Sequence, residues 1–314
     1  MVIDWHTHVL PVTESSKPMW KGRCQMTVDN VLAAQARTRI DVSVISNPLH
    51  YLRRATGKEA LAAIRESNRY LAEIQDAQPD RIVAFASTLP GGGDAHLAEL
   101  ERAITRDKLR GVFINSSHQG AYPDDKEATP FFELVTRLDI PVFMHPPPVG
   151  FGEERMERFR LASSIGRPFD TCLALARLML FGVLERFPGL KLVVSHLGGG
   201  ICEVLGRLDY NFELQDEGFY VREADSERML IQHPPSHYRV YFDTVSYHLP
   251  ALRCALDTMG ADHMLFGTDA PPLTPLKERG LALIDELGLG ETDKRKVLFE
   301  NAARLLSMED SINL

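Results

Sequence analysis

The stretch of sequence that decides the fold reads Val2-Ile3-Asp4-Trp5-His6-Thr7-His8-Val9-Leu10-Pro11. Its apolar, partly β-branched ends and its closing proline predict a short buried strand. Residues two apart on a strand point to the same face, so His6 and His8 would stand side by side. Two adjacent imidazoles suit a divalent metal ion, although two histidines hydrogen-bonded to backbone carbonyls at the edge of a core are the more ordinary interpretation. The rest of the chain decides between these alternatives.

Strands alternate with helices along the rest of the chain. After the first strand we expect strands at 41–47, 81–87, 111–115, 140–145, 190–196, 238–243 and 263–268. Thr27 is expected to cap the first helix, and Phe169–Phe187 is expected to form one strongly apolar helix. Eight alternating units in one domain of residues 1–314 favour closure into a (β/α)8 TIM barrel. An open doubly wound sheet is the alternative, but no Gly-x-Gly-x-x-Gly follows the first strand.

Composition narrows the class of protein. The chain has 314 residues and a net charge of −8, which argues against a general nucleic-acid binder. The longest apolar run, Leu173–Leu184, is interrupted by Arg177 and is too short to cross a membrane. No signal peptide is expected, because Asp4 and His6 lie where its apolar core would be needed. The four cysteines form no Cys-x-x-Cys pair, which is typical of free thiols in a cytoplasmic protein.

Two loops are longer than ordinary connections. One is an insertion at about 12–26, directly after the first strand, and the other spans 149–167 after the fifth strand. Long loops after the strands of an α/β protein often contact substrate. The triple glycine Gly91–Gly93 favours a turn and helix start over a phosphate cradle, since no Gly-Lys-Ser/Thr follows it.

Side chains that can bind metals recur at the carboxyl ends of the predicted strands. The first strand ends in His6 and His8, the fifth in His145, the sixth in His196 and the eighth in Asp269. In a closed barrel these ends meet at one mouth, which is where barrel active sites form. Any one of the five could be structural, but together they indicate one pocket with a metal site.

Four motifs carry a resemblance to a known family. They are His6-Thr7-His8, Phe143-Met144-His145-Pro146, Val194-Ser195-His196-Leu197-Gly198-Gly199-Gly200 and Phe266-Gly267-Thr268-Asp269. Together they resemble the amidohydrolase superfamily, and within it the decarboxylase-like branch, from residue 2 to about 304. The resemblance implies a (β/α)8 barrel that holds one divalent metal ion, usually Zn²⁺ and in some members Mn²⁺. Two-metal members have a bridging lysine after strand four, whereas residues 111–116 contain none.

The resemblance also implies roles for the five side chains. It implies that His6, His8, His145 and Asp269 bind the metal, with a water completing the shell, and that Asp269 and His196 are catalytic. His196 would act mainly as an acid/base partner beside the metal water, and a fifth ligand is the alternative for it.

Three further residues are expected to serve the substrate. Arg207 follows His196 by eleven residues, and the resemblance implies that it reaches a substrate carboxylate across a homodimer interface. An ordinary surface arginine is the alternative. Arg23 lies in the loop after the first strand, where a relative has a substrate-binding arginine. His248 follows the seventh strand and is expected to support the substrate site rather than to bind the metal.

The resemblance implies non-oxidative decarboxylation of a small aromatic or unsaturated carboxylic acid. A metal-dependent hydrolase or hydratase would use the same site, and a non-catalytic metal-binding scaffold is a third alternative. The two long loops match nothing closely, so the substrate itself is not named by the sequence.

Overall fold

The computed structural model describes residues 1–11, 14, 17, 25–48, 55–148, 150–217, 229–271 and 277–308. Arg23, and most of the predicted insertion at 12–26, lie outside these residues. Within this part of the chain, no helix combines the length and the apolar character that crossing a bilayer requires.

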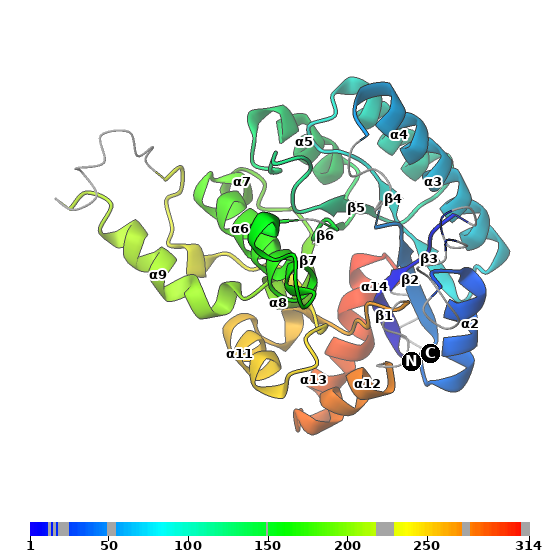
Figure 1. The fold of residues 1–314 in the computed structure, drawn as a ribbon. Helices are drawn as coiled ribbons and strands as arrows, with labels where there is room; N and C mark the ends of the chain where they lie inside the picture. The colour runs from blue at the N-terminus through cyan, green and yellow to red at the C-terminus, as the bar shows by residue number, and fades with distance from the viewer. Residues whose placement is uncertain are drawn as a thin grey trace.

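Parallel strands form the centre of the molecule (Figure 1). They are β1 (Ile3–His8), β2 (Val42–Ser46), β3 (Ile82–Ala84), β4 (Ala86–Ser87), β5 (Val112–Asn115), β6 (Val142–His145), β7 (Leu192–Val194), β8 (Tyr241–Asp243) and β9 (Met264–Leu265). They match the eight predicted strands, with the third divided at Phe85 into β3 and β4. The Phe85 N–H still donates to the Ile45 carbonyl at 3.0 Å, so the division does not open the sheet.

Backbone hydrogen bonds join β1 to the segment that follows β9. The Trp5 N–H donates to the Phe266 carbonyl, and the His8 N–H donates to the Ala270 carbonyl, both at 2.8 Å. The segment that follows β9 therefore pairs with β1 and closes the ring. The predicted (β/α)8 barrel is confirmed.

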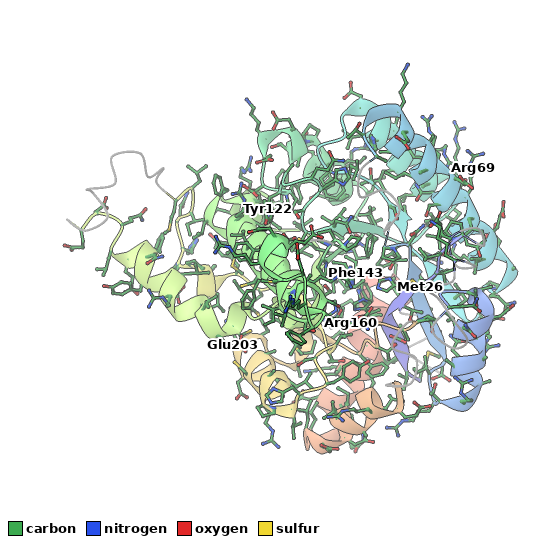
Figure 2. The ribbon with its side chains drawn as sticks, in the orientation of Figure 1. Met26, Arg69, Tyr122, Phe143, Arg160 and Glu203 are labelled. Atoms are coloured by element: carbon green, nitrogen blue, oxygen red, sulfur yellow. The ribbon has the colours of Figure 1, made fainter. Side chains whose placement is uncertain are left out.

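A β-bulge in β1 separates a packed interior from a polar mouth. Asp4 pairs with Ser43 and Thr7 with Ile45, so β1 has one extra residue between these pairs. Because of it, the consecutive Trp5 and His6 rings both lie edge-on to Phe143, at 6.4 and 5.0 Å. Figure 2 places Phe143 among the side chains inside the strands, whereas Arg69 points outward from α3 (Gly57–Ala77). The bulge lets Trp5 fill the core while His6 faces the mouth.

Helices surround the strands, and most of them pack an apolar face on the core (Figure 1). Besides α3 they are α2 (Val28–Arg37), α4 (Asp94–Thr105), α5 (Thr129–Arg137), α6 (Arg167–Leu180), α7 (Val183–Arg186), α8 (Ser195–Gly198), α9 (Ile201–Glu213), α11 (Leu249–Met259), α12 (Lys277–Glu286), α13 (Glu291–Arg295) and α14 (Asn301–Leu305). The predicted cap of α2 is confirmed, since the Thr27 hydroxyl accepts from the Asn30 N–H at 3.3 Å. Residues of α14 pack against the amino ends of the strands and close the other end of the barrel.

The prediction of a single helix over Phe169–Phe187 is wrong. Gly182 has a left-handed backbone (φ 69°) and separates α6 from α7. A Cβ at Gly182 would lie 2.2 Å from the Leu230 carbonyl oxygen, so only glycine allows this approach. The preceding long loop also contains more helix than expected, because Ala162–Gly166 forms a π-helical turn that continues into α6.

Candidate active site

The five side chains singled out by sequence meet at the barrel mouth. The Nε2 atoms of His6 and His8 are 3.0 Å apart. Asp269 Oδ1 lies 3.4 Å from His6 Nε2 and 3.2 Å from His8 Nε2, and its Oδ2 lies 3.5 Å from His196 Nε2. Possible ligand atoms of His6, His145, His196 and Asp269 all lie within 4.8 Å of one another. A single ion could contact several of these atoms at once.

Buried hydrogen bonds orient the first two histidines. His6 Nδ1 donates to Asp243 Oδ2 at 2.6 Å, which leaves the lone pair of Nε2 facing the cluster. His8 Nδ1 lies 3.2 Å from the Ser46 hydroxyl. A carboxylate behind a histidine is the usual arrangement at a metal site, because it fixes the tautomer and the ring plane.

His145 provides the test of whether a metal fits. Its ring is buried, and among the described residues neither Nδ1 nor Nε2 has a hydrogen-bond partner. A buried polar atom without a partner costs free energy unless a ligand or water satisfies it. The ring lies 5.0 Å from that of His6 and 4.8 Å from that of His8. The residues therefore fit a bound cation, and three imidazoles with one carboxylate form a donor set suited to a divalent transition metal.

At three of the four candidate ligands, His8, His145 and Asp269, the electrostatics favour the state that binds a cation. Burial, reinforced by the neighbouring histidines, lowers the pKa of His145 well below its ordinary value, so the ring is neutral. Burial alone would raise the pKa of Asp269, but His6, His196 and His8 lower it well below the usual range. Burial also lowers the pKa of His8. At His6 burial alone would lower the pKa, but the carboxylates of Asp243 and Asp269 outweigh it and raise the pKa. The site therefore combines a neutral imidazole with an ionised carboxylate.

A left-handed turn places His196. Five consecutive residues, 196–200, have positive φ, between 55° at Leu197 and 96° at Gly200. This backbone is costly for a residue with a Cβ, so the cost is reduced by placing glycine at three of the five positions. The His196 N–H donates to Asp243 Oδ1 at 2.8 Å, so Asp243 holds this turn as well as His6. Backbone strain of this kind is concentrated at functional sites.

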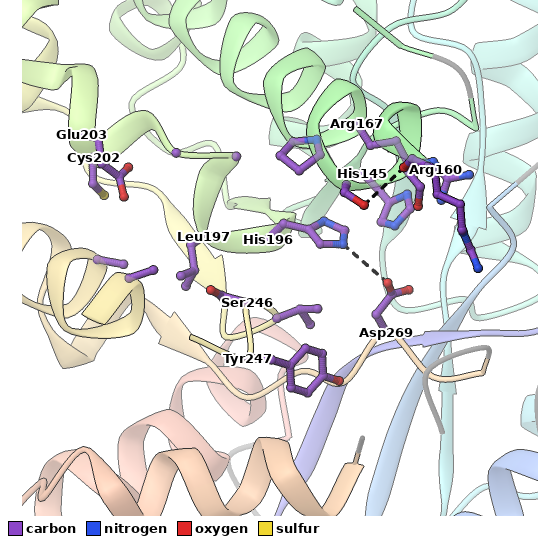
Figure 3. Close-up of a pocket in the computed structure, with 18 of the residues that line it drawn as sticks. His145, Arg160, Arg167, His196, Leu197, Cys202, Glu203, Ser246, Tyr247 and Asp269 are labelled. Atoms are coloured by element: carbon purple, nitrogen blue, oxygen red, sulfur yellow. Dashed lines mark hydrogen bonds and ion pairs between the residues drawn. The ribbon is translucent and has the colours of Figure 1, made fainter. Parts of the chain in front are cut away.

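The cluster lies against a pocket of about 830 Å³ (Figure 3). Arg160 and Arg167 lie on one side of it, and Cys202 and Glu203 lie on the other. Leu197, Val245 and Pro168 supply apolar lining. The volume suits a small organic molecule.

An amidohydrolase family model matches residues 3–308 of the chain. The chain belongs to the amidohydrolase family. It is 28% identical over 275 residues to a 2-amino-3-carboxymuconate-6-semialdehyde decarboxylase of Dictyostelium discoideum, covering 87% of this chain and 74% of the relative. The predicted family is confirmed.

Solved structures share the fold of this amidohydrolase. A 5-carboxyvanillate decarboxylase from Sphingomonas paucimobilis matches with a TM-score of 0.86 and 22% identity, over 98% of each chain. A dihydroxybenzoic acid decarboxylase from Polaromonas sp. JS666, with bound manganese and an inhibitor, matches with a TM-score of 0.80 and 22% identity, over 100% of this chain and 98% of that one.

Two residues predicted to contact substrate lie elsewhere in the amidohydrolase chain. Arg207 is exposed on α9, which projects away from the barrel (Figure 1). His248 is exposed at the start of α11, and neither residue lines the pocket of the single chain. The structure therefore brings together the metal-binding and acid/base candidates but not these two.

No polar role was predicted from the sequence for four residues of the amidohydrolase site. Asp243 ends β8, so the same strand-end rule that found the histidines could have found it. Tyr247 donates from its hydroxyl to the Thr268 carbonyl at 2.6 Å and so supports the residue before Asp269. Arg160 and Arg167 line the pocket from the long loop and the start of α6, where the sequence contains no motif.

Proposed function

We propose that this chain is a metal-dependent non-oxidative decarboxylase of a small aromatic or unsaturated carboxylic acid. The observation that carries the proposal is the Asp269–His196 pair, placed beside three further histidines at a pocket of small-molecule size. The decarboxylase that is 28% identical over most of this chain supports the same chemistry.

We propose His6, His8, His145 and Asp269 as the ligands of one ion. A divalent ion held there would polarise the oxygen atoms of the substrate as a Lewis acid. The imidazole-rich donor set favours zinc, although the Polaromonas neighbour contains manganese.

Asp269 and His196 would hold and transfer the proton that the reaction requires. The pair delivers the proton that it shares to the carbon that bears the carboxylate, and a C–H bond forms there. The bond from that carbon to the carboxylate then breaks, its electron pair returns to the conjugated system, and carbon dioxide leaves. Water later restores the proton to the pair. A positioned proton donor contributes roughly 10²–10⁴-fold in rate.

Product analysis over a panel of hydroxybenzoates and unsaturated diacids tests this function. We expect carbon dioxide release without ring opening, and loss of at least about 100-fold of the rate in Asp269→Asn. Asp257→Asn, a change on the exposed face of α11, is the control and should leave turnover unchanged. Water addition or bond hydrolysis in place of carbon dioxide release would instead establish the hydrolase or hydratase alternative. Normal turnover in a metal-loaded Asp269→Asn variant would refute the role of Asp269.

The identity of the ion has its own test. Chelation should abolish turnover, and zinc should restore it more fully than manganese. Better recovery with manganese would overturn the choice of zinc, and recovery with neither ion would overturn metal dependence.

We propose that the active form is a homodimer in which Arg207 reaches the partner's pocket. Its exposure on the projecting α9 supports this role, because Arg207 is not among the described residues that line the pocket of its own chain. We further propose that Arg23 binds the substrate carboxylate and that His248 supports the substrate site from the start of α11. The free thiols of Cys172, Cys202 and Cys254 are consistent with a cytoplasmic location.

A further inference from the structure

Two arginines give the pocket a cationic side that the proposed reaction does not use. Arg160 and Arg167 lie together beside His145 and Asp269 (Figure 3). Arg167 is partly buried at the start of α6, and Arg160 is exposed at the rim. Arg167 begins α6, which packs on the barrel, and Arg160 lies in the turn before the π-helical segment that leads into α6.

Neither guanidinium forms an ion pair with a carboxylate in the part of the chain that the structure describes. Arg167 Nε donates to the Pro148 carbonyl at 3.3 Å. Two other partly buried arginines differ, since Arg102 binds Asp107 at 2.7 Å and Arg177 binds Asp124 at 2.7 Å, whereas Arg81 donates to the Leu32 carbonyl at 3.2 Å. Burial lowers the pKa of Arg167, and Arg160 lowers it further against the opposing charge of Asp269. An unpaired, partly desolvated cation costs free energy that a bound anion would offset.

The charges of the pocket indicate how many anionic groups the ligand has. Asp269 is already surrounded by His6, His8 and His196, and a divalent ion in the cluster would more than balance it. With both arginines this side of the pocket then has about three positive charges in excess. One carboxylate at the cluster leaves both guanidinium groups without a counter-charge.

We propose that the substrate has two acidic groups, of which one reacts at the cluster and the other is held by Arg167 and Arg160. Only the reaction of the first acidic group rests on the proposed function. The planar guanidinium of Arg167 suits a carboxylate, which it binds through two parallel hydrogen bonds. Glu203 on the opposite side of the pocket disfavours an anion there and so fixes the orientation of the substrate. An aromatic or unsaturated dicarboxylate has the required chemistry.

Equilibrium binding to the metal-loaded protein tests this with two matched probes, isophthalate and benzoate, measured by calorimetry. We expect isophthalate to bind about 100-fold more tightly than benzoate, because its second carboxylate pairs with the partly buried Arg167. Arg167→Gln should remove most of that preference, and Arg160→Gln, at the exposed rim, should reduce it about tenfold. Arg158→Gln changes an exposed arginine of the same segment that does not line the pocket, and it should leave the preference unchanged.

Turnover supplies the second measurement, with 4-hydroxyisophthalate and salicylate as substrates. In Arg167→Gln we expect KM to rise about 100-fold for the diacid and to change little for the monoacid, with kcat nearly constant for both.

The outcomes separate this inference from the proposed function. If no acid releases carbon dioxide but the preference for isophthalate exists and depends on Arg167, the proposed function fails and the two-anion pocket stands. If monoacids are decarboxylated while isophthalate binds no more tightly than benzoate, the inference is overturned and the function stands. A preference that survives in both Arg167→Gln and Arg160→Gln also overturns it.

Discussion

At the scale of single residues, Asp243 is the group on which the geometry of two other residues depends. It is fully buried, binds His6 Nδ1 through Oδ2 at 2.6 Å, and accepts from the His196 and Val245 N–H groups through Oδ1 at 2.8 and 3.0 Å. One carboxylate therefore orients His6 and anchors the turn that contains His196.

Asp243→Asn should lower metal affinity roughly 10–100-fold, because an amide nitrogen facing His6 cannot accept its proton. A chelator-competition titration measures this, with the thermal midpoint recorded in parallel to show that the variant is folded. Asp41→Asn is the matched control, since Asp41 is exposed and accepts from the Val2 N–H at the opposite end of the strand. Equal metal affinity in both variants would show that Asp243 does not position the ligand.

Single residues were predictable where a local pattern marked them. His6 and His8 are two apart on a strand, and His145, His196 and Asp269 follow strands, so their meeting at the mouth could be anticipated. Arg167 has no such pattern, because it looks like any arginine that begins a helix. Its place in the pocket depends on the path of residues 150–166, which short-range propensity does not determine.

At the scale of elements, the turn between β7 and α9 depends on glycine. A Cβ at Gly199 would lie 2.0 Å from the Pro168 carbonyl oxygen and 2.8 Å from the Cys172 nitrogen, so this turn packs directly on the backbone of α6. The triple glycine after His196 thus permits contact between two elements as well as a left-handed backbone.

Gly199→Ala should therefore destabilise the fold by at least about 2 kcal/mol, from left-handed strain plus displacement of α6. Urea unfolding measures the change. Gly206→Ala lies in α9, where a Cβ would meet nothing within 4 Å, and it should be neutral or stabilising by about 0.5–1 kcal/mol. A Gly199→Ala protein as stable as Gly206→Ala would show that the close approach to α6 is not required.

The contact between α3 and α4 makes the stability of the fold depend on pH. The buried Glu99 carboxylate accepts two 2.8 Å hydrogen bonds from Arg102 and one of 3.0 Å from Asn68. Burial alone would raise the pKa of Glu99, but these bonds lower it below the ordinary 4.5. The stabilisation is therefore present above the pKa of the unfolded chain and is lost as pH falls through the lower folded-state pKa.

Glu99→Gln should cost roughly 1–3 kcal/mol of unfolding free energy at pH 7, and the difference from the parent protein should shrink toward pH 3. Urea unfolding at several pH values checks this. Glu101→Gln on the same helix affects an exposed pair with Arg137 and should cost less than about 1 kcal/mol. A difference that stays constant with pH would contradict the assigned role of Glu99.

The type and order of the elements were predictable from the sequence. Their limits were not predictable where contacts between distant segments determine them. The alternation of strands and helices was correct, and Thr27 was recognised as a cap. The break at Gly182 was missed because the apolar pattern of Phe169–Phe187 continues through it, and the reason for the break is Leu230, distant in sequence.

At the scale of the whole molecule, the exposed position of Arg207 makes the proposed dimer testable. Arg207→Ala and Asp269→Asn subunits should each form inactive homodimers. A mixed dimer would still contain one pocket with an intact Asp269 and an intact Arg207 from the partner. Refolding the two variants together should therefore restore about a quarter of the parent activity. Copurification of two tags verifies the mixed dimers. If verified mixed dimers stay inactive, Arg207 does not act across an interface.

The closure of the barrel has a consequence for how the protein is made. His8 and Asp269 are 3.2 Å apart in the fold but are translated roughly ten seconds to a minute apart. The ribosome releases β1 long before the segment after β9 that will pair with it. Until then the first histidines have neither their carboxylate partner nor a complete barrel around them. We therefore expect the nascent chain to acquire its metal only late in synthesis, once the segment containing Asp269 has left the exit tunnel.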